Sequence, residues 1–301
     1  MRKRMPQEKR GGLLILAVAL AVVLLVTACG PAPTTPTGEK TVEVGVLFPL
    51  TGGGGPATQP SFQGLMDYVT YSNEENRIPG YAIELLWRDT MTQRAPAISG
   101  YAWFVDRQLP LIWFASPQDI SAISNRLDRD QTPIVSIACE SPEMIEPPGW
   151  VFSTWSPWGE SISVLLDYFM ENWKEESAPK LTFFVIDVGF GWGPSNDAAE
   201  YAEKKGFEVL PFEVGSHVIV DASTQLLRIQ DGEADLVYIQ HIFTGIGPIL
   251  RDAQRLGLTG ETQFATWMFA QSVLDMAPMG SEGLIFQTNL PWFDEAEIPG
   301  V

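Results

Sequence analysis

The chain has 301 residues, of which 37 are acidic and 19 basic, and its formal net charge is −18 at pH 7. This excess of negative charge argues against binding to nucleic acid or to anionic lipid headgroups, because both would be repelled. The two cysteines, Cys29 and Cys139, are too few for a disulfide framework or a thiolate metal cluster. The two histidines, His217 and His241, lack the HExxH spacing of a zinc site, so we expect no metal.

Residues 1–29 have the pattern of a secretory signal. Several basic residues are followed by an uninterrupted apolar run from Leu13 to Val26, and then by Thr27-Ala28-Cys29. A cysteine after a small residue at this point resembles the bacterial lipobox, in which the cysteine is acylated. A transmembrane anchor is the alternative, but the apolar run is short for a span of roughly 20 residues. We expect residues 1–28 to be a lipoprotein signal peptide, with lipid on Cys29 as the anchor to the cell membrane.

Residues 29–40 are rich in proline and threonine and hold no side chain that could anchor a core. Such a segment is typical of an extended, solvated tether. We expect the folded part to begin near Lys40. About 260 residues then remain, which is enough for one large domain or two lobes.

From residue 41 onward, apolar runs alternate with amphipathic stretches. The first series predicts strands at 41–50, 82–88, 109–115 and 134–138, and helices at 61–73 and 97–107. Ser116-Pro117 followed by Asp119 has the chemistry of a helix N-terminus, with the serine as cap, and Ser141-Pro142-Glu143 repeats it.

The same alternation restarts after residue 152. This second series predicts helices from Ser156-Pro157 to 173 and at 196–205, 224–230 and 248–256, and strands at 181–187, 207–214, 236–242, 262–269 and 283–290. Two such series indicate two α/β lobes with parallel sheets. One long sheet and a (β/α)8 barrel remain as alternatives.

No enzyme signature is complete. The glycines at 52–55 lack the Gly-Lys-Ser/Thr of a phosphate loop, and no GxSxG elbow is present. Residues 189–193 suit a dinucleotide loop superficially, but Trp192 and Pro194 stand where the backbone must approach the ligand closely. We therefore expect no catalytic residue and no cofactor, and predict that the protein is not an enzyme.

Candidate binding residues follow the predicted strands. In open α/β sheets, ligands bind beyond the carboxyl ends of the strands. Four strand-to-helix joints carry suitable side chains, namely residues 116–119, 138–141, 190–192 and 241–244. Tryptophans also occur at segment ends, at Trp155, Trp158, Trp192, Trp267 and Trp292, where aromatic side chains commonly line ligand sites. Each serine can equally serve as a helix cap, and each tryptophan can equally belong to a core.

Several stretches occur in an order and spacing that resemble a known family. They are Gly45-Val46-Leu47-Phe48-Pro49-Leu50-Thr51-Gly52, Thr132-Pro133-Ile134-Val135-Ser136-Ile137-Ala138, Asp221-Ala222-Ser223-Thr224-Gln225-Leu226, Asp235-Leu236-Val237-Tyr238 and Ile249-Leu250-Arg251-Asp252-Ala253. The chain resembles the type I periplasmic binding proteins of ABC importers, in the branched-chain amino-acid group. The resemblance implies two doubly wound parallel-sheet lobes joined by a hinge. The family continues well past the position of Val301, so we expect either that a C-terminal part is missing or that the first lobe lacks some of its covering elements.

In that family, a Ser/Thr-rich loop and an Ala-Thr pair hold the ligand's carboxylate. The matching positions are Ser116-Pro117-Gln118 and Ala138-Cys139-Glu140, so Glu140 stands where the family has a hydroxyl. The family's acidic partner for the ligand amine should fall near Trp267-Met268, where neither residue is acidic. A carboxylate at Glu140 would repel a ligand carboxylate and favour an amine, amide or hydroxyl.

We therefore expect an extracytoplasmic, lipid-anchored solute-binding protein that captures a small polar solute, amino acid or amide-like, in an interlobe cleft and delivers it to a permease. A ligand-sensing receptor domain of the same fold is the alternative. Lobe 1 is expected to hold residues 41–152 plus 288–301, and lobe 2 residues 153–287. The expected partners are the solute and the ABC permease subunits, with the protein itself a monomer. The predicted ligand-binding residues are Ser116, Gln118, Ala138, Glu140, Trp155, Phe190, Trp192, His241, Phe243 and Trp267.

Overall fold

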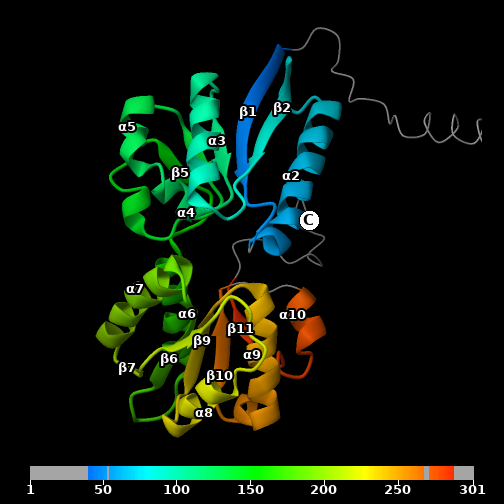
Figure 1. Cartoon of the computed structure of the whole chain (residues 1–301). Helices are drawn as coiled ribbons and strands as arrows, with labels where there is room; N and C mark the ends of the chain where they lie inside the picture. The colour runs from blue at the N-terminus through cyan, green and yellow to red at the C-terminus, as the bar shows by residue number, and fades with distance from the viewer. Residues whose placement is uncertain (1–39, 53, 268–270, 288–301) are drawn as a thin grey trace, which may run out of the picture. The chain divides into compact units, whose positions relative to one another are not determined.

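The computed structural model describes residues 40–52, 54–267 and 271–287 (Figure 1). These residues form two compact units, 40–42 with 67–83 and 43–66 with 84–287. They contain two sheets, one of five strands in the order β2-β1-β3-β4-β5 and one of six in the order β11-β10-β9-β6-β7, with β8 also paired to β6. The prediction of an α/β fold with parallel sheets in two lobes is confirmed. Residues 1–39, with Cys29 and the tether up to Glu39, and residues 288–301, including Trp292, lie outside the described residues, and Lys40 already belongs to strand β1.

The first sheet is formed by the first series of segments. Its strands are β1 (Lys40–Phe48), β2 (Tyr81–Asp89), β3 (Ile112–Phe114), β4 (Ile134–Ser136) and β5 (Val151–Ser153). The segments between them include helices α2 (Gly55–Glu74), α3 (Arg94–Asp106), α4 (Pro117–Ser121) and α5 (Leu127–Asp130). The pairs β1–β3, β3–β4 and β4–β5 are parallel. Strand β5 was not predicted, because a strand of three residues has no periodicity to detect.

Alternate side chains of β1 serve the two faces of this sheet. Leu47 packs with Phe104 and other residues of the cluster under α3. Phe48 points the other way and meets Phe62 of α2 and Trp113 of β3 in edge-to-face contacts, with ring centroids 5.2 and 5.6 Å apart. This alternation is the two-residue period of a strand whose two faces pack against different elements.

The second sheet is formed by the second series. Its strands are β6 (Lys180–Ile186), β7 (Glu208–Val209), β8 (Glu213–Gly215), β9 (Leu236–Gln240), β10 (Gln263–Thr266) and β11 (Ile285–Phe286). Its helices are α6 (Trp158–Asn172), α7 (Gly189–Lys205), α8 (Ser223–Asp231), α9 (Phe243–Leu256) and α10 (Gln271–Met276). Every pair with a described register is parallel. Helix α10 was not predicted.

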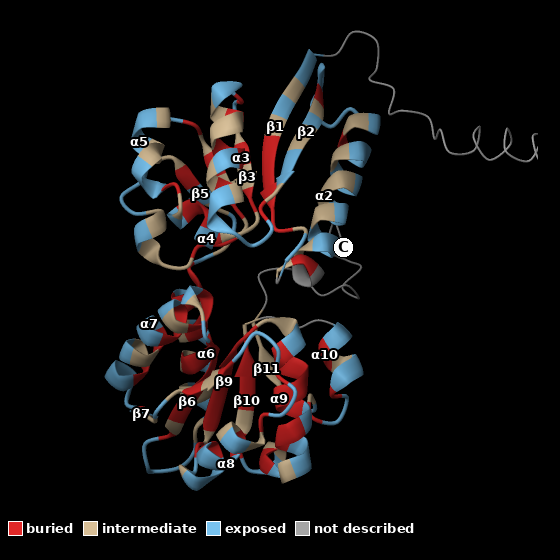
Figure 2. Cartoon of the chain, in the orientation of Figure 1, coloured by how far each residue is buried: buried red, intermediate tan, exposed pale blue. Residues whose placement is uncertain are grey.

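Helices cover both faces of the second sheet. Phe183 and Val185 of β6 belong to the cluster under α6 and α7, whereas Phe184 belongs to the cluster under α8 and α9. The central strands are accordingly coloured as buried in Figure 2. Burial on both faces explains why these strands are continuous apolar runs in the sequence, since no position faces water.

The predicted helix starts differ in detail from the structure. Helix α4 begins at Pro117 as expected, but the Ser116 side chain forms no cap bond, and it donates instead to Gln118. Ser141 precedes only a short 3₁₀ turn, Pro142–Met144, also without a cap bond. Helix α6 has Pro157 at its N-cap and ends at Asn172. The predicted strand 207–214 is split into β7 and β8.

The predicted loop at 189–193 is the first part of helix α7. Gly191 explains this difference, because a Cβ at this position would collide with the carbonyl oxygen of Ile186. Because residue 191 is a glycine, helix α7 can begin as early as Gly189, three residues after β6 ends, and pack closely against Ile186. The glycine thus permits close packing of the helix against the strand.

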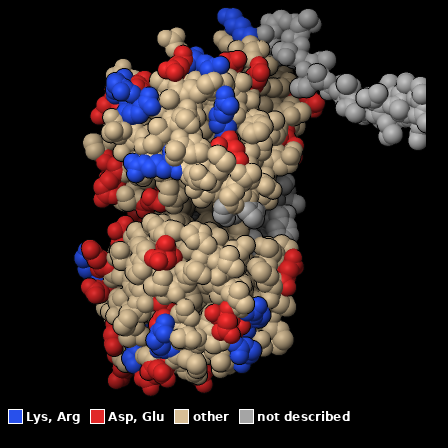
Figure 3. Space-filling model, in the orientation of Figure 1, with Lys and Arg blue, Asp and Glu red and all other residues tan. Residues whose placement is uncertain are grey.

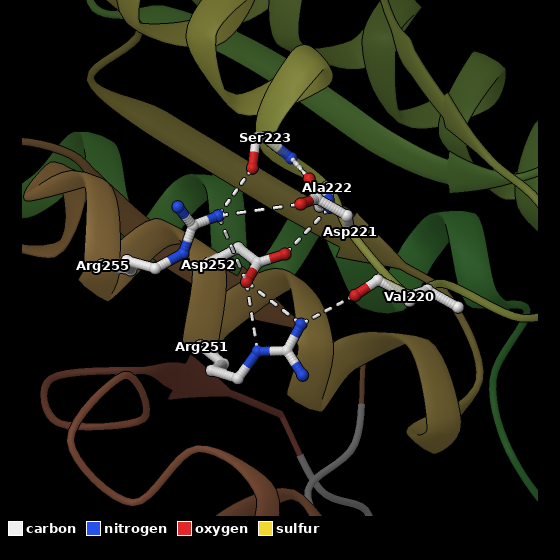
Figure 4. A network of polar contacts seen from close by, with 7 residues as sticks. All are labelled: Val220, Asp221, Ala222, Ser223, Arg251, Asp252 and Arg255. Atoms are coloured by element: carbon white, nitrogen blue, oxygen red, sulfur yellow. Dashed lines mark hydrogen bonds and ion pairs between the residues drawn. The ribbon is translucent and has the colours of Figure 1, made fainter.

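A buried carboxylate ties the loop before α8 to α9 (Figure 4). Asp252 accepts the backbone N–H of Ala222 at 2.9 Å and pairs with the Arg251 guanidinium at 3.0 Å. Arg255 lies 3.6 Å from the same carboxylate and donates to the Ser223 hydroxyl at 2.6 Å. Charge and hydrogen bonds are thus satisfied together, as a buried carboxylate requires.

Candidate functional site

Ser116, Gln118 and Glu140 form a chain of hydrogen bonds beyond the carboxyl ends of β3 and β4. The Ser116 hydroxyl donates to Oε1 of Gln118 at 2.7 Å. Nε2 of Gln118 in turn donates to Oε1 of Glu140 at 2.6 Å. The parallel pairing of β3 with β4 brings these residues together, because it places the two loops at the same edge of the sheet.

Glu140 is a partly buried carboxylate. Burial raises its pKa above the ordinary value, and the hydrogen bond from Gln118 opposes this with a smaller effect. Among the described residues, Glu140 has no ion-pair partner, and no hydrogen bond is made by its second oxygen, Oε2. It is therefore an acceptor with unused capacity next to the strand ends.

Four aromatic side chains form a second group of candidate residues. The rings of Trp158 and Phe190 meet edge to face at 4.6 Å, and Phe190 meets Trp267 at 5.4 Å. Phe243 stacks on Trp267 at 5.6 Å with an interplanar angle of 14°. The indole N–H of Trp267 donates to the carbonyl oxygen of His241 at 2.7 Å, which fixes the ring. We call these four residues the aromatic cluster.

The aromatic cluster lies beside the loop that carries Glu140. Ala138, Trp158 and Phe190 share one buried apolar group, against which Trp155 and Trp267 also pack. The backbone N–H of Trp158 donates to the carbonyl oxygen of Cys139, the residue directly before Glu140, at 3.3 Å. The loop of this acceptor carboxylate therefore adjoins an aromatic cluster in which Trp158 and Phe190 are buried and Phe243 and Trp267 are partly exposed. Trp158, the first residue of α6, belongs to this group although it is not one of the predicted ligand-binding residues.

Trp192 and His241, which are also predicted ligand-binding residues, make their contacts with other parts of the protein. Trp192 stacks on Phe212 at 5.9 Å and donates to Asp187 at 3.0 Å. The His241 side chain is fully buried, with Nδ1 3.2 Å from the carbonyl oxygen of Ile242 and Nε2 3.0 Å from that of Ser216. Burial lowers the pKa of His241. A neutral imidazole has one N–H, so only one of these contacts is a hydrogen bond, but both ring nitrogens are buried against protein carbonyl groups in this arrangement.

Asp119 is a buried carboxylate that the sequence pattern presented only as a helix N-terminal charge. Its side chain, on α4, is 5% exposed, and Oδ2 has no hydrogen-bond partner among the described residues. Burial raises its pKa to about 6, and the neighbouring Thr90 hydroxyl acts in the opposite direction. Nothing in the local sequence indicates this burial, because it results from the packing of α4 against the loop after β2.

The surface visible in Figure 3 has acidic and basic side chains interspersed. It shows no large basic patch of the kind that nucleic acids bind. Within the described part of the chain, no helix combines the length and apolar character needed to span a membrane. The same residues contain no group of histidine, cysteine and acidic side chains arranged to hold a metal ion.

Solved structures of transport proteins share this fold. A branched-chain amino acid ABC transporter protein from Thermus thermophilus, with bound valine, is 22% identical over 83% of this chain and 65% of its own, with a TM-score of 0.74. A fatty acid ABC transporter substrate-binding protein from Thermomonospora curvata is 17% identical over 82% of this chain and 63% of its own, with a TM-score of 0.71. A leucine binding protein from Thermotoga maritima is 21% identical over 83% of this chain and 70% of its own, with a TM-score of 0.70.

The chain thus spans slightly less than two thirds of the first two of these proteins. A direct comparison with curated protein sequences finds no match. A family model described as periplasmic binding protein matches residues 41–300, which include both sheets and the candidate site. The chain therefore belongs to the periplasmic binding protein family.

Proposed function

We propose that this protein is an extracytoplasmic solute-binding protein of an ABC importer, which captures a small solute and delivers it to a permease without catalysing a reaction. Family membership supports this role. The observation that carries it is the hydrogen-bond chain ending at Glu140 beside the aromatic cluster. A polar acceptor next to apolar rings suits a solute with a polar head and an apolar body.

The proposed ligand-binding residues come from both sheets. Ser116, Gln118, Ala138 and Glu140 follow strands of the first sheet, and Trp155, Trp158, Phe190, Phe243 and Trp267 belong to or pack against the aromatic cluster. We propose lobes of residues 41–152 with 288–301 and of residues 153–287, which close around the solute through a hinge. His241 is left out because its ring is fully buried against protein carbonyl groups, and Trp192 because its indole N–H donates to Asp187.

A thermal-shift screen of the full chain tests the binding role. Amino acids, amides, amines, polyamines, small carboxylates and fatty acids would be added singly. A ligand at 100 times its Kd should raise the free energy of unfolding by about 2.7 kcal/mol. Small-angle scattering with the stabilising solute should then show compaction. The role is contradicted if no solute of any class stabilises the protein.

The aromatic cluster provides a matched pair of variants for the solute that the screen identifies. Phe243→Ala should weaken binding by roughly tenfold or more, because the solute loses an apolar contact. Phe152→Ala is the control, since Phe152 is 55% exposed on β5 of the first sheet. Equal losses in both variants would remove the cluster from the site.

We further propose that Cys29 anchors the protein through a lipid. The short apolar run and the Thr27-Ala28-Cys29 sequence support this. Cys29→Ala expressed in a bacterial host should leave the membrane fraction or retain its signal, while binding of the solute is unchanged. Unchanged fractionation and electrophoretic mobility would contradict the anchor and leave the binding role intact.

A further inference from the structure

We infer that Glu140 determines the chemical class of the solute: the site takes a head group that donates hydrogen bonds, an ammonium or an amide, and rejects a carboxylate at this position. The inference rests on the proposed function. It specifies which solute binds at the site beyond β3 and β4.

The direction of the hydrogen bonds leaves only acceptor capacity at this point. The Ser116 hydroxyl donates to the amide oxygen of Gln118, so the amide nitrogen faces Glu140 and donates to Oε1. An ionised carboxylate has about four acceptor positions and no donor. Oε2 has no hydrogen-bond partner among the described residues, so an incoming group must bring the donor itself.

The charge at this position is also unbalanced. Three carboxylates with mostly buried side chains are paired with arginine: Asp130 with Arg126 and Arg129, Glu213 with Arg228, and Asp252 with Arg251 and Arg255. Glu140 has no such cation within the described part of the chain. A partly buried charge without a partner is unfavourable, and an ammonium group would offset this cost. A ligand carboxylate would instead be repelled.

The neighbouring rings favour the same class of solute. The carbonyl oxygen of Cys139 accepts a hydrogen bond from the backbone N–H of Trp158, and Ala138 packs with Trp158 and Phe190. Aromatic faces attract ammonium groups, and their apolar area suits an alkyl or aryl body. An amine or amide with a branched or aromatic hydrocarbon chain therefore matches both halves of the site.

Matched compounds test this on the wild-type protein by titration calorimetry. The pairs are isoamylamine and isocaproate, phenethylamine and hydrocinnamate, and leucinamide and leucine. The amine or amide should bind at least roughly tenfold more tightly than its acid partner, as expected for charge-assisted hydrogen bonds. Equal or tighter binding of the acids overturns the inference, as does the absence of binding by all six compounds.

Two isosteric variants assign the preference to Glu140. Glu140→Gln should weaken binding of the preferred amine by roughly 10- to 100-fold. Glu143→Gln removes the same charge from an exposed position three residues away and should leave the affinity unchanged. Equal affinities in wild type and Glu140→Gln overturn the inference. If Glu140→Gln does not fold, the titrations of the paired compounds into the wild-type protein decide whether the site prefers donors. The proposed binding role is a separate question, and it is contradicted only if no solute of the thermal-shift screen binds.

Discussion

Buried carboxylates differ between the segments that directly follow β3 and β4 and the elements of the second sheet. Asp119 and Glu140, beyond the first sheet, have no arginine or lysine partner among the described residues. Glu213 and Asp252, around the second sheet, are both paired with arginine. Burial raises the pKa of Asp119 and of Glu140.

This difference separates residues that hold the fold together from residues that cost stability. A paired and hydrogen-bonded carboxylate such as Asp252 specifies how a loop sits on a helix. An unpaired buried carboxylate lowers the free energy of unfolding relative to an uncharged side chain of similar size. Unpaired buried acids near strand ends are therefore the ones to test for a functional role.

The largest effect is expected from Asp252→Ala. The variant leaves the backbone N–H of Ala222 and the Arg251 guanidinium without their buried partner. The free energy of unfolding should fall by about 2–3 kcal/mol, because the buried N–H of Ala222 loses its acceptor, whereas the half-exposed arginines can bind water instead. Urea unfolding measures it. Glu200→Ala, which removes an exposed ion pair with Lys204, is the control and should change stability by less than about 0.5 kcal/mol.

Asp119→Asn should change stability in the opposite direction. The pKa of Asp119 is about 6 in the folded protein, against an ordinary value of 3.8, so folding favours the protonated carboxyl. Its contribution is fully favourable below about pH 4 and is lost as the pH rises through 6. The variant should therefore exceed wild type in unfolding free energy by about 2–3 kcal/mol at pH 7.

The pH dependence of that difference provides the check. It should be small near pH 4 and grow up to pH 7, while Asp128→Asn, at an exposed position on α5, should follow wild type throughout. A constant difference between Asp119→Asn and wild type would show that ionisation of Asp119 is not the cause.

A smaller effect is expected from Arg228→Met, which creates an unpaired acid in the second sheet. Arg228 binds Glu213 through two guanidinium nitrogens, but its own side chain is half-exposed. Water can replace part of the interaction, so the loss should be about 1–2 kcal/mol. If Arg228→Met and Glu200→Ala are equally mild by urea unfolding, pairing does not distinguish Glu213 from a surface acid.

The candidate site could be predicted from the sequence in part. Parallel sheets place the loops after successive strands at one edge, so Ser116, Gln118 and Glu140 were expected to be neighbours, and the structure joins them by hydrogen bonds. Trp158 and Asp119 were not selected. Their sequence contexts, a helix start in each case, do not reveal which side chains the packing of distant segments will bury.

The sequence by itself indicated the fold class and the order of the longer elements, but not the short strand β5, helix α10 or the division of 207–214 into β7 and β8. Apolar runs such as 181–186 and 236–240 predict strands covered on both faces, because hydrophobic burial depends on the local pattern of residues. Only the tertiary structure decided where individual polar groups point. Helix α7 begins at Gly189 because Gly191 packs against Ile186, His241 faces the carbonyl of Ser216, and Glu140 lacks a cation. The first is a contact over five residues that the glycine pattern alone does not reveal, and the other two depend on which residues far apart in the sequence come together.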